Sequence, residues 1–396
     1  MPRRPRVAFV VARCGAGVIG GAERLCLETA SHMAESWDVE ILTTCATDYA
    51  TWKNEYAPGL MMQGNVPVRR FPVDRLRDRA TFDRLSAKLS QRPQDASAED
   101  QAAWMAAQGP ACSALSAYLE EHATSLDAVY FYSYLYATTY DNVQRVAAKA
   151  VLVSLAHDEW MLRLPMWNSM FESAQRVVCL TPEEEHLLAS RFAPAQLRTS
   201  LIALGIDEAA PDIETGFADE FETAAPYALY VGRVDAAKNC AELVRDFIEL
   251  ATRGEPTIRL VLMGPVSMTL PDHPSLKVRG PVGENVKRRA MAQAAFVVVP
   301  SLFESLSLVA LESWRQSTAV LVNGGSSVLV GQCRRSGGGV WYGNRAEFAA
   351  QYTTCLQGRA EALGRQGNIY VKERYRWDDV TRSHRNLIER RPARTS

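Results

Sequence analysis

The sequence predicts an α/β protein with two parallel-sheet domains in tandem. Its 396 residues exceed the roughly 250–300 residues that one hydrophobic core organises. Short runs of β-branched and other apolar residues alternate with helical stretches, which is typical of parallel βαβ units. The alternation stops once, near the middle of the chain, and then restarts. We therefore expect two sheets rather than one.

The expected strands fall into two series. The first series comprises the apolar runs at 7–12, 39–44, 127–132, 150–155 and 176–181. The second series comprises the runs at 227–232, 258–264, 294–300 and 319–323. Residues 74–123 depart from this rhythm and are expected to be helical.

An acidic linker separates the two series. Asp207 to Glu222 carries seven acidic residues and no Lys or Arg, so it cannot bury enough apolar surface to build an element. We therefore place an N-terminal domain at 1–206, the linker at 207–224 and a C-terminal domain at 225–375. Residues 376–396 contain an amphipathic pattern, and we expect this helix to pack back on the N-terminal domain.

Composition excludes several classes of protein. The 44 Lys and Arg residues nearly balance the 45 Asp and Glu residues, so no overall positive field exists to hold nucleic acid. The eight cysteines include no CxxC pair, which argues against a zinc or redox site. The first apolar run is interrupted at Arg13 and is interpreted as a strand rather than a signal peptide. We expect a cytoplasmic protein, at most peripheral at the inner face of the membrane.

A local basic run lies at 66–92. It carries eight basic side chains against three acidic ones. One interpretation is an ordinary solvated helical face. The other is a surface that meets an anionic acceptor or anionic membrane lipid.

A glycine motif follows the first expected strand. Gly15, Gly17 and Gly20 spell GxGxxG, the dinucleotide fingerprint, and taken alone they predict an NAD-dependent oxidoreductase. That fingerprint also requires an acidic residue at the end of the second strand, where this sequence has Thr43 and Thr44. Without that acid, the oxidoreductase is only an alternative interpretation. Independently of it, the glycines allow close backbone approach to a ligand, and the following helix start can face an anion.

Two cations follow the first strand of the second series. Arg233 comes directly after Gly232, and Lys238 follows five residues later, where a helix is expected to begin. Cations at the carboxyl end of a parallel strand suit a diphosphate. The alternative is a pair of surface residues that bind no ligand.

Two glutamates, eight residues apart, follow the buried run at 294–300. We expect Glu304 on a loop, where it can accept hydrogen bonds from sugar hydroxyls, and Glu312 inside a helix, where it can reach a ribose. The N–H groups of Ser305, Leu306 and Ser307 would point at phosphate from the start of that helix. The alternative for Glu304 is a first-turn acid that complements the helix dipole.

Taken together, these motifs resemble a known family. Gly20-Gly21-Ala22-Glu23, Gly232-Arg233 with Lys238, and the Glu304-x7-Glu312 spacing resemble the retaining GT-B glycosyltransferases of glycosyltransferase family 4, also called glycosyl transferases group 1. The resemblance covers most of the chain and is weakest at 74–123. It implies two Rossmann-like domains facing each other across a cleft, a nucleoside diphosphate sugar held by the second and an acceptor held by the first. It implies neither a metal nor another cofactor.

The resemblance also implies roles for single residues. Arg233 and Lys238 would neutralise the donor diphosphate, Glu304 would contact the transferred sugar and Glu312 would hold the ribose. His157, in the segment SLAHDEW, would lie beside the transferred sugar, and Gly20 and Gly21 would contact the donor. The sequence departs from the family at Glu304-Ser305-Leu306-Ser307, where the usual motif is Glu-Gly-Phe-Gly. A non-catalytic subunit that binds sugar nucleotides remains a further alternative.

The acceptor side is less defined. Aromatic residues follow the strand at 127–132, where the family places its acceptor, and we expect acceptor contacts from Tyr134, Tyr136 or Tyr140, with Asp158 as a further candidate. With the basic run, these residues suggest a glycan or lipid-linked acceptor. The resemblance implies a role in polysaccharide, O-antigen or glycolipid assembly.

Overall fold

The computed structural model describes residues 3–18, 20–193, 197–207, 226–253 and 258–389. The chain forms two compact units. The N-terminal unit runs to Leu204 and includes the segment that starts at Asp378, and the C-terminal unit spans Gly205–Trp377. Apart from Asp207, the acidic linker expected at 207–224 lies outside the described residues. Each unit is described by itself.

The described part of the N-terminal unit contains an eight-stranded sheet in the order β3-β4-β2-β1-β5-β6-β7-β8. Its pairs are parallel, except for the antiparallel hairpin of β3 and β4. The strands are β1 (Arg6–Val10), β2 (Asp38–Thr44), β3 (Gly59–Gln63), β4 (Val66–Phe71), β5 (Ala128–Tyr132), β6 (Ala150–Val153), β7 (Arg176–Cys179) and β8 (Thr199–Leu201). Strands β2, β3 and β4 lie on one side of β1, and strands β5 to β8 follow on its other side. The strand order therefore reverses between β1 and β5.

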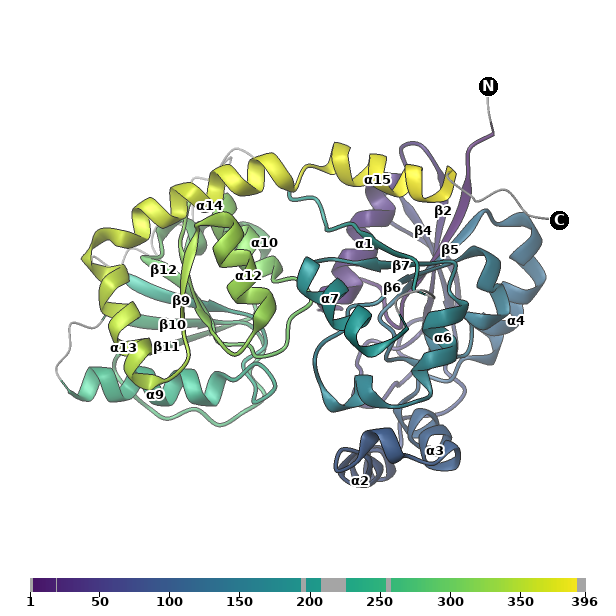
Figure 1. Ribbon diagram of the computed structural model, residues 1–396, viewed down its shortest axis with the longest axis horizontal. Helices are drawn as coiled ribbons and strands as arrows, with labels where there is room; N and C mark the ends of the chain where they lie inside the picture. The colour runs from purple at the N-terminus through teal and green to yellow at the C-terminus, as the bar shows by residue number, and fades with distance from the viewer. Residues whose placement is uncertain (1–2, 19, 194–196, 208–225, 254–257, 390–396) are drawn as a thin grey trace. The chain divides into compact units, whose positions relative to one another are not determined.

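Helices accompany this sheet, most of them on its two faces (Figure 1). They are α1 (Gly21–Met33), α2 (Arg79–Leu89), α3 (Ala98–Gln108), α4 (Ser113–His122), α5 (Ala137–Tyr140), α6 (Trp167–Ser173), α7 (Pro182–Arg191) and α15 (Trp377–Glu389). Short 3₁₀ turns lie at Pro93–Asp95, Ala123–Ser125, Gln144–Lys149 and Trp160–Arg163. Several helices begin at side-chain caps, because Asp78, Ser97 and Thr181 accept hydrogen bonds from the first free N–H groups of α2, α3 and α7.

Strand β5 shows how the N-terminal sheet builds a core on both faces. Successive side chains of a strand point to opposite faces. Val129 and Phe131 belong to the large cluster formed with the helices of one face. Tyr130 points the other way, where its ring stacks on Phe9 at 5.1 Å between centroids. His384 of α15 lies on that side too, with its Nδ1 3.2 Å from the Tyr130 hydroxyl, so the C-terminal helix is anchored on this sheet.

In the C-terminal unit, the described residues form a six-stranded sheet in the order β11-β10-β9-β12-β13-β14, with parallel pairing. The strands are β9 (Tyr227–Val231), β10 (Arg259–Met263), β11 (Leu276–Gly280), β12 (Phe296–Val299), β13 (Val320–Asn323) and β14 (Gly339–Tyr342). The strand order reverses between β9 and β12.

The helices of the C-terminal unit lie on both faces of its sheet (Figure 1). They are α9 (Cys240–Thr252), α10 (Glu284–Gln293), α11 (Leu308–Arg315), α12 (Ser327–Ser336), α13 (Arg345–Thr354) and α14 (Ala360–Arg374), with a π-helical turn at Cys355–Arg359. Phe247 of α9 and Phe348 of α13 join the same buried cluster as the strand residues Leu262 and Val298. Helix α14 packs against α11 and α12.

The strands predicted from the apolar runs are present as β1, β2, β5, β6, β7, β9, β10, β12 and β13. The sequence analysis missed β3, β4, β8, β11 and β14. Strand β4 contains Arg69 and Arg70, and β11 contains Lys277 and Arg279, so neither carries the continuous apolar run that marks a strand buried on both faces. Strand β8 has only three residues.

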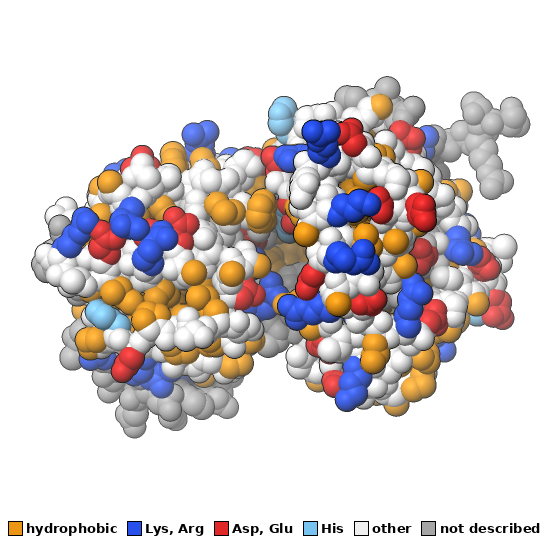
Figure 2. All heavy atoms as spheres, turned by 90° about the horizontal axis from the view of Figure 1, so that it is seen from below, with side chains coloured by type: hydrophobic (Ala, Val, Ile, Leu, Met, Phe, Trp, Pro, Cys, Tyr) orange, Lys and Arg blue, Asp and Glu red, His pale blue; other side chains and the backbone are white. Residues whose placement is uncertain are grey.

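The interpretation of 66–92 as one basic helical face is wrong. Its first part is β4, where Arg69 Nε binds Glu40 Oε1 at 2.8 Å and Arg70 is buried, donating to the Cys14 carbonyl at 2.9 Å. In the helical part, Lys88 binds Asp100 at 2.8 Å. Figure 2 shows Lys and Arg side chains on this unit interspersed with Asp and Glu. Much of the basic run is therefore paired within the unit.

Within the described residues, none of the helices combines the length and the hydropathy needed to cross a bilayer.

His384 should make the stability of the protein depend on pH. Burial lowers its pKa to about 4, against about 6.5 in an unfolded chain. Between these pH values the unfolded chain takes up a proton on this histidine and the folded protein does not. The free energy of unfolding therefore falls as the pH drops from about 6.5 toward 4, and above pH 6.5 the histidine does not lower it. Between pH 7 and pH 5 the wild type should lose about 2 kcal/mol more unfolding free energy than His384→Gln.

Urea unfolding of both proteins at the two pH values measures this difference. The remaining titratable groups are common to wild type and variant, so they cancel in the comparison. An identical loss in the two proteins would show that His384 does not carry the pH dependence.

Candidate functional site

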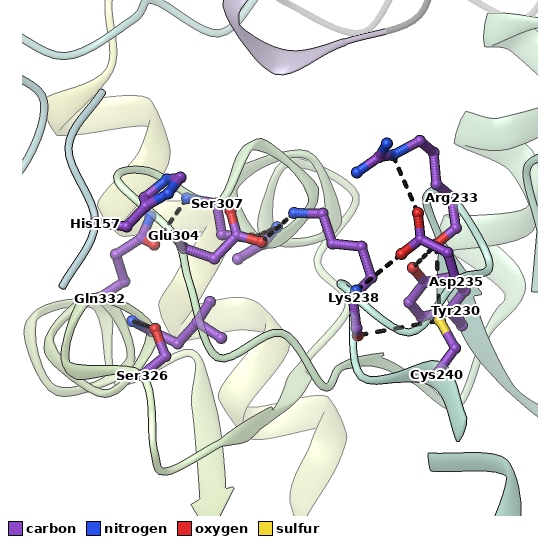
Figure 3. A network of polar contacts seen from close by, with 12 residues as sticks. His157, Tyr230, Arg233, Asp235, Lys238, Cys240, Glu304, Ser307, Ser326 and Gln332 are labelled. Carbon is purple, nitrogen blue, oxygen red and sulfur yellow. Dashed lines mark hydrogen bonds and ion pairs between the residues drawn. The ribbon is translucent and has the colours of Figure 1, made fainter. Parts of the chain in front are cut away.

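The carboxyl ends of β9 and β12 bring together the residues that are predicted to bind the nucleoside diphosphate sugar. The two strands are parallel neighbours, with Phe296 opposite Ala228, so the loops that follow them leave the same edge of the sheet at the point where the strand order reverses. Open α/β sheets bind ligands at this position. Arg233 and Lys238 lie on the first loop, Glu304 lies on the second, and Lys238 Nζ is 2.8 Å from Glu304 Oε1 (Figure 3).

Two glycines allow the backbone to turn at the start of this site. Gly232 has φ of 142° and Gly264, after β10, has φ of 138°, a region that favours glycine. A Cβ on Gly264 would lie 1.9 Å from the Gly232 carbonyl oxygen. The ends of β9 and β10 can therefore approach this closely only with glycine at 264. The Tyr230 hydroxyl donates to the Arg233 carbonyl at 2.5 Å and holds the next turn.

Asp235 organises both cations of the β9 loop. Its Oδ1 accepts a hydrogen bond from the Lys238 backbone N–H at 2.9 Å, and its Oδ2 lies 3.5 Å from Arg233 Nε (Figure 3). The sequence analysis did not single out this residue. An Asp between two cations in a turn, GRVDAAK, was an available signal, because Asp commonly bonds backbone N–H groups that follow it.

The loop after β12 and the start of α11 agree with the expected placement of the two glutamates. Glu304 lies on the loop and Glu312 lies inside α11. Ser307 caps the helix, since its Oγ accepts from the Ala310 N–H at 3.3 Å. Its φ is −85°, so the backbone conformation at this position does not need the glycine that the family motif has there.

The backbone N–H of Ser307 does not point where the sequence predicts. Its backbone N–H donates to Gln332 Oε1 of α12 at 3.1 Å (Figure 3), so this N–H is not directed at phosphate as expected. Ser305 and Leu306 are both buried. Gln332 was missed, because its partner lies 25 positions away, at the start of the preceding helix.

Glu312 has a lysine partner that the sequence analysis did not find. Lys287 Nζ, on α10, is 3.0 Å from each of the two Glu312 carboxylate oxygens. It also lies 2.9 Å from Glu284 Oε1. Lys287 gave no signal in the sequence, because its partner lies 25 positions away on the next helix.

The glycine loop after β1 is closed by its own side chains. Arg13 and Glu23 form a buried ion pair, and a Cβ on Gly20 would lie 2.0 Å from Glu23 Oε2. Glu23 therefore folds back over the start of α1, which begins at Gly21 as expected. At the end of β2, the Thr44 hydroxyl donates to the Ala12 carbonyl at 2.6 Å. The position of the ribose-binding acid is thus taken by a threonine, which gives the oxidoreductase no support.

The loop after β6 carries His157. Its Nδ1 lies 3.2 Å from Glu159 Oε1, an arrangement that orients the imidazole. The preceding backbone is fixed by Glu184 of α7, whose Oε1 accepts from the Ser154 hydroxyl at 2.6 Å and from the Ala156 N–H at 2.7 Å. The pKa of Glu184 is raised, because burial raises it more than these hydrogen bonds lower it. Asp158 is exposed and lies 2.8 Å from Arg163.

The three tyrosine candidates differ in burial. Tyr134 is 1% exposed and packs edge-on against Trp167, so its selection as an acceptor contact is wrong: its ring belongs to the core. Tyr136 packs edge-on against Trp52, Tyr140 packs edge-on against Trp167, and both keep part of their surface exposed. Only these two of the three can meet a ligand.

Among the residues that the structure describes, no cluster of three or more His, Cys, Asp or Glu side chains is placed to hold a metal ion.

The chain is similar to a known protein family and to solved structures. Residues 225–357 match the family model described as Glycosyl transferases group 1. This part of the chain is a glycosyl transferases group 1 domain. It contains the β9 and β12 loops and both glutamates of the site. Comparison with curated proteins gave no match.

Solved structures similar to the whole chain have the same fold. Sucrose-phosphate synthase from Thermosynechococcus elongatus is 17% identical with a TM-score of 0.70, covering 98% of each chain. HepE from Anabaena in complex with UDP is 13% identical with a TM-score of 0.65, covering 97% of this chain and 99% of its own. The trehalose-6-phosphate structure from E. coli bound with UDP-2-fluoro glucose is 11% identical with a TM-score of 0.70, covering 98% and 99%.

These likenesses establish the fold as GT-B, with two Rossmann-like domains. With the family match in the C-terminal unit, the protein is a glycosyltransferase of the GT-B type.

Proposed function

We propose that the protein transfers a glycosyl unit from a nucleoside diphosphate sugar to an acceptor hydroxyl with retention of anomeric configuration. The observation that carries this proposal is the meeting of Lys238 and Glu304, beside Arg233, where the strand order of the C-terminal sheet reverses. A nuclear magnetic resonance assignment of the product anomer, compared with that of the donor, tests retention. A product of inverted configuration would contradict it.

The two cations supply the charge that a departing diphosphate needs. Arg233 and Lys238 are held by Asp235 and Glu304 in the described structure. A bound diphosphate would compete for both cations and would leave the Glu304 carboxylate to accept hydrogen bonds from the hydroxyls of the transferred sugar. Cations fixed where negative charge develops stabilise the transition state without reorganisation. The donor site therefore needs no metal in this proposal.

Retention follows if the leaving phosphate itself accepts the proton of the attacking hydroxyl. The acceptor then approaches on the face from which the phosphate departs, and the chain supplies orientation and charge stabilisation. His157, oriented by Glu159, is proposed as the contact of the N-terminal unit with the donor sugar. The start of α1 at Gly20 and Gly21 is proposed to lie beside the donor.

The donor can be identified by thermal shift with UDP, GDP, ADP and dTDP. UDP is the first choice because HepE was solved in complex with UDP. A nucleotide present at 100 times its dissociation constant adds about 2.7 kcal/mol to the stability. Donor binding without any turnover would favour the non-catalytic subunit instead of an enzyme.

Arg233 and Lys238 should be required for turnover. Replacing either by Ala should cost about 2–4 kcal/mol of transition-state stabilisation, measured as the loss of kcat/KM for donor turnover in a buffer containing EDTA. Arg365→Ala is the matched control, since Arg365 is an exposed arginine on α14 and should leave kcat/KM unchanged. Near-wild-type turnover in both site variants would refute the assignment of the diphosphate site.

Glu304 and Glu312 should separate in their effects on binding. Glu312→Gln should lower the affinity for the free nucleoside diphosphate and for the intact donor alike, because both ligands contain the ribose. Glu304→Gln should lower the affinity for the intact donor alone, because only that ligand carries the transferred sugar. Calorimetric titration with each ligand measures the four affinities, and equal losses for both ligands in both variants would contradict these roles.

On the acceptor side, we propose a glycan or lipid-linked acceptor bound by the N-terminal unit, with Tyr136, Tyr140 and Asp158 as contacts, in polysaccharide, O-antigen or glycolipid assembly. Of the basic run, Arg79 and Arg84 of α2 are exposed. Each basic side chain near an anionic surface contributes about 1 kcal/mol.

Anionic vesicles should therefore bind the protein, and the double variant Arg79→Gln, Arg84→Gln should bind them roughly 30-fold more weakly. Co-sedimentation with anionic and with neutral vesicles measures this. Absence of binding to either kind of vesicle would indicate a soluble glycan acceptor.

A further inference from the structure

The pair formed by Lys287 and Glu312 is mostly shielded from water. The Lys287 side chain is 13% exposed and that of Glu312 is 9% exposed. One ammonium nitrogen lies 3.0 Å from both Glu312 oxygens and 2.9 Å from Glu284 Oε1. An ammonium has three N–H donors, so these three contacts match its full donor capacity. The position of the nitrogen is thereby fixed between α10 and α11.

Burial makes this pairing matter for Glu312. A carboxylate removed from water without a partner is costly. Lys287 supplies that partner, because it compensates the charge and contacts both oxygens at once.

We propose that Lys287 is a positioning residue that keeps the Glu312 carboxylate oriented for the ribose hydroxyls, and so sets the preference of the site for ribonucleotides over 2′-deoxyribonucleotides. This inference rests on the proposed role of Glu312 in the donor site. Lys287 touches the carboxylate rather than the nucleotide, and acts through it. A buried pair that only braced two helices would contribute little to stability and would not distinguish the two kinds of sugar.

The experiment compares UDP with 2′-deoxy-UDP, and GDP with 2′-deoxy-GDP as a second pair, by calorimetric titration. A hydrogen bond to a charged group is worth at least tenfold in affinity, so wild type should prefer the ribonucleotide by about tenfold or more. Lys287→Met should lower the affinity for the ribonucleotide about tenfold more than that for the 2′-deoxy form, which keeps only the 3′-hydroxyl for Glu312. The preference would then fall close to one.

Two further variants separate positioning from bracing. Lys287→Arg keeps the charge and should retain the preference. Glu284→Gln removes the other contact of the ammonium while leaving the contact with Glu312, and it should also retain the preference. Circular dichroism at the same temperature confirms that each variant is folded before its titration.

The outcomes distinguish this inference from the proposed function. A ribonucleotide preference that Lys287→Met leaves unchanged would overturn the role of Lys287 while the donor site stands. An equal loss of affinity for both forms would overturn it too, because that is the result of a general disturbance of the site. If wild type bound neither ribonucleotide, the proposed function would fail and this inference with it.

Discussion

The ion pair between Lys238 and Glu304 is the contact on which the rest of the C-terminal site depends. The two residues lie 66 positions apart and meet because β9 and β12 are parallel neighbours whose carboxyl ends share one edge of the sheet. Without a ligand, the acids of this edge compensate its cations: Asp235 lies beside Arg233, and Glu304 lies beside Lys238. A diphosphate would therefore enter by exchange, replacing carboxylates at the cations rather than binding to unpaired charges.

Buried carboxylates and their partners fix local geometry in both units. Glu184 holds the backbone before His157 through the Ser154 hydroxyl and the Ala156 N–H, and Glu312 is held by Lys287. Each carboxylate is buried, so leaving it without partners would cost several kcal/mol. The conformations that keep these contacts are therefore strongly favoured. Loops fixed in this way are preorganised, which lowers the cost of ordering them when a ligand binds.

The departures from the family motif become understandable once backbone angles are considered. Ser307 stands where the family has glycine, yet its φ of −85° is open to any residue, and its hydroxyl gains a helix cap. Gly232 and Gly264 are different, because their φ values are strongly positive and their backbones lie in contact. Glycine is thus retained where the chain must turn or approach closely, and serine takes its place where a cap is useful.

The sequence by itself determined the strands with continuous apolar runs, the tandem arrangement, and the placement of Glu304 on a loop and Glu312 in a helix, because these features depend on residues close together in the chain. Only the tertiary structure decided which side chains are partners. Lys287 and Gln332 acquired their roles through contacts set by helix packing. Tyr134 was lost to the core for the same reason: side-chain direction on a loop after a strand is decided by what packs against it, and local sequence does not contain that information.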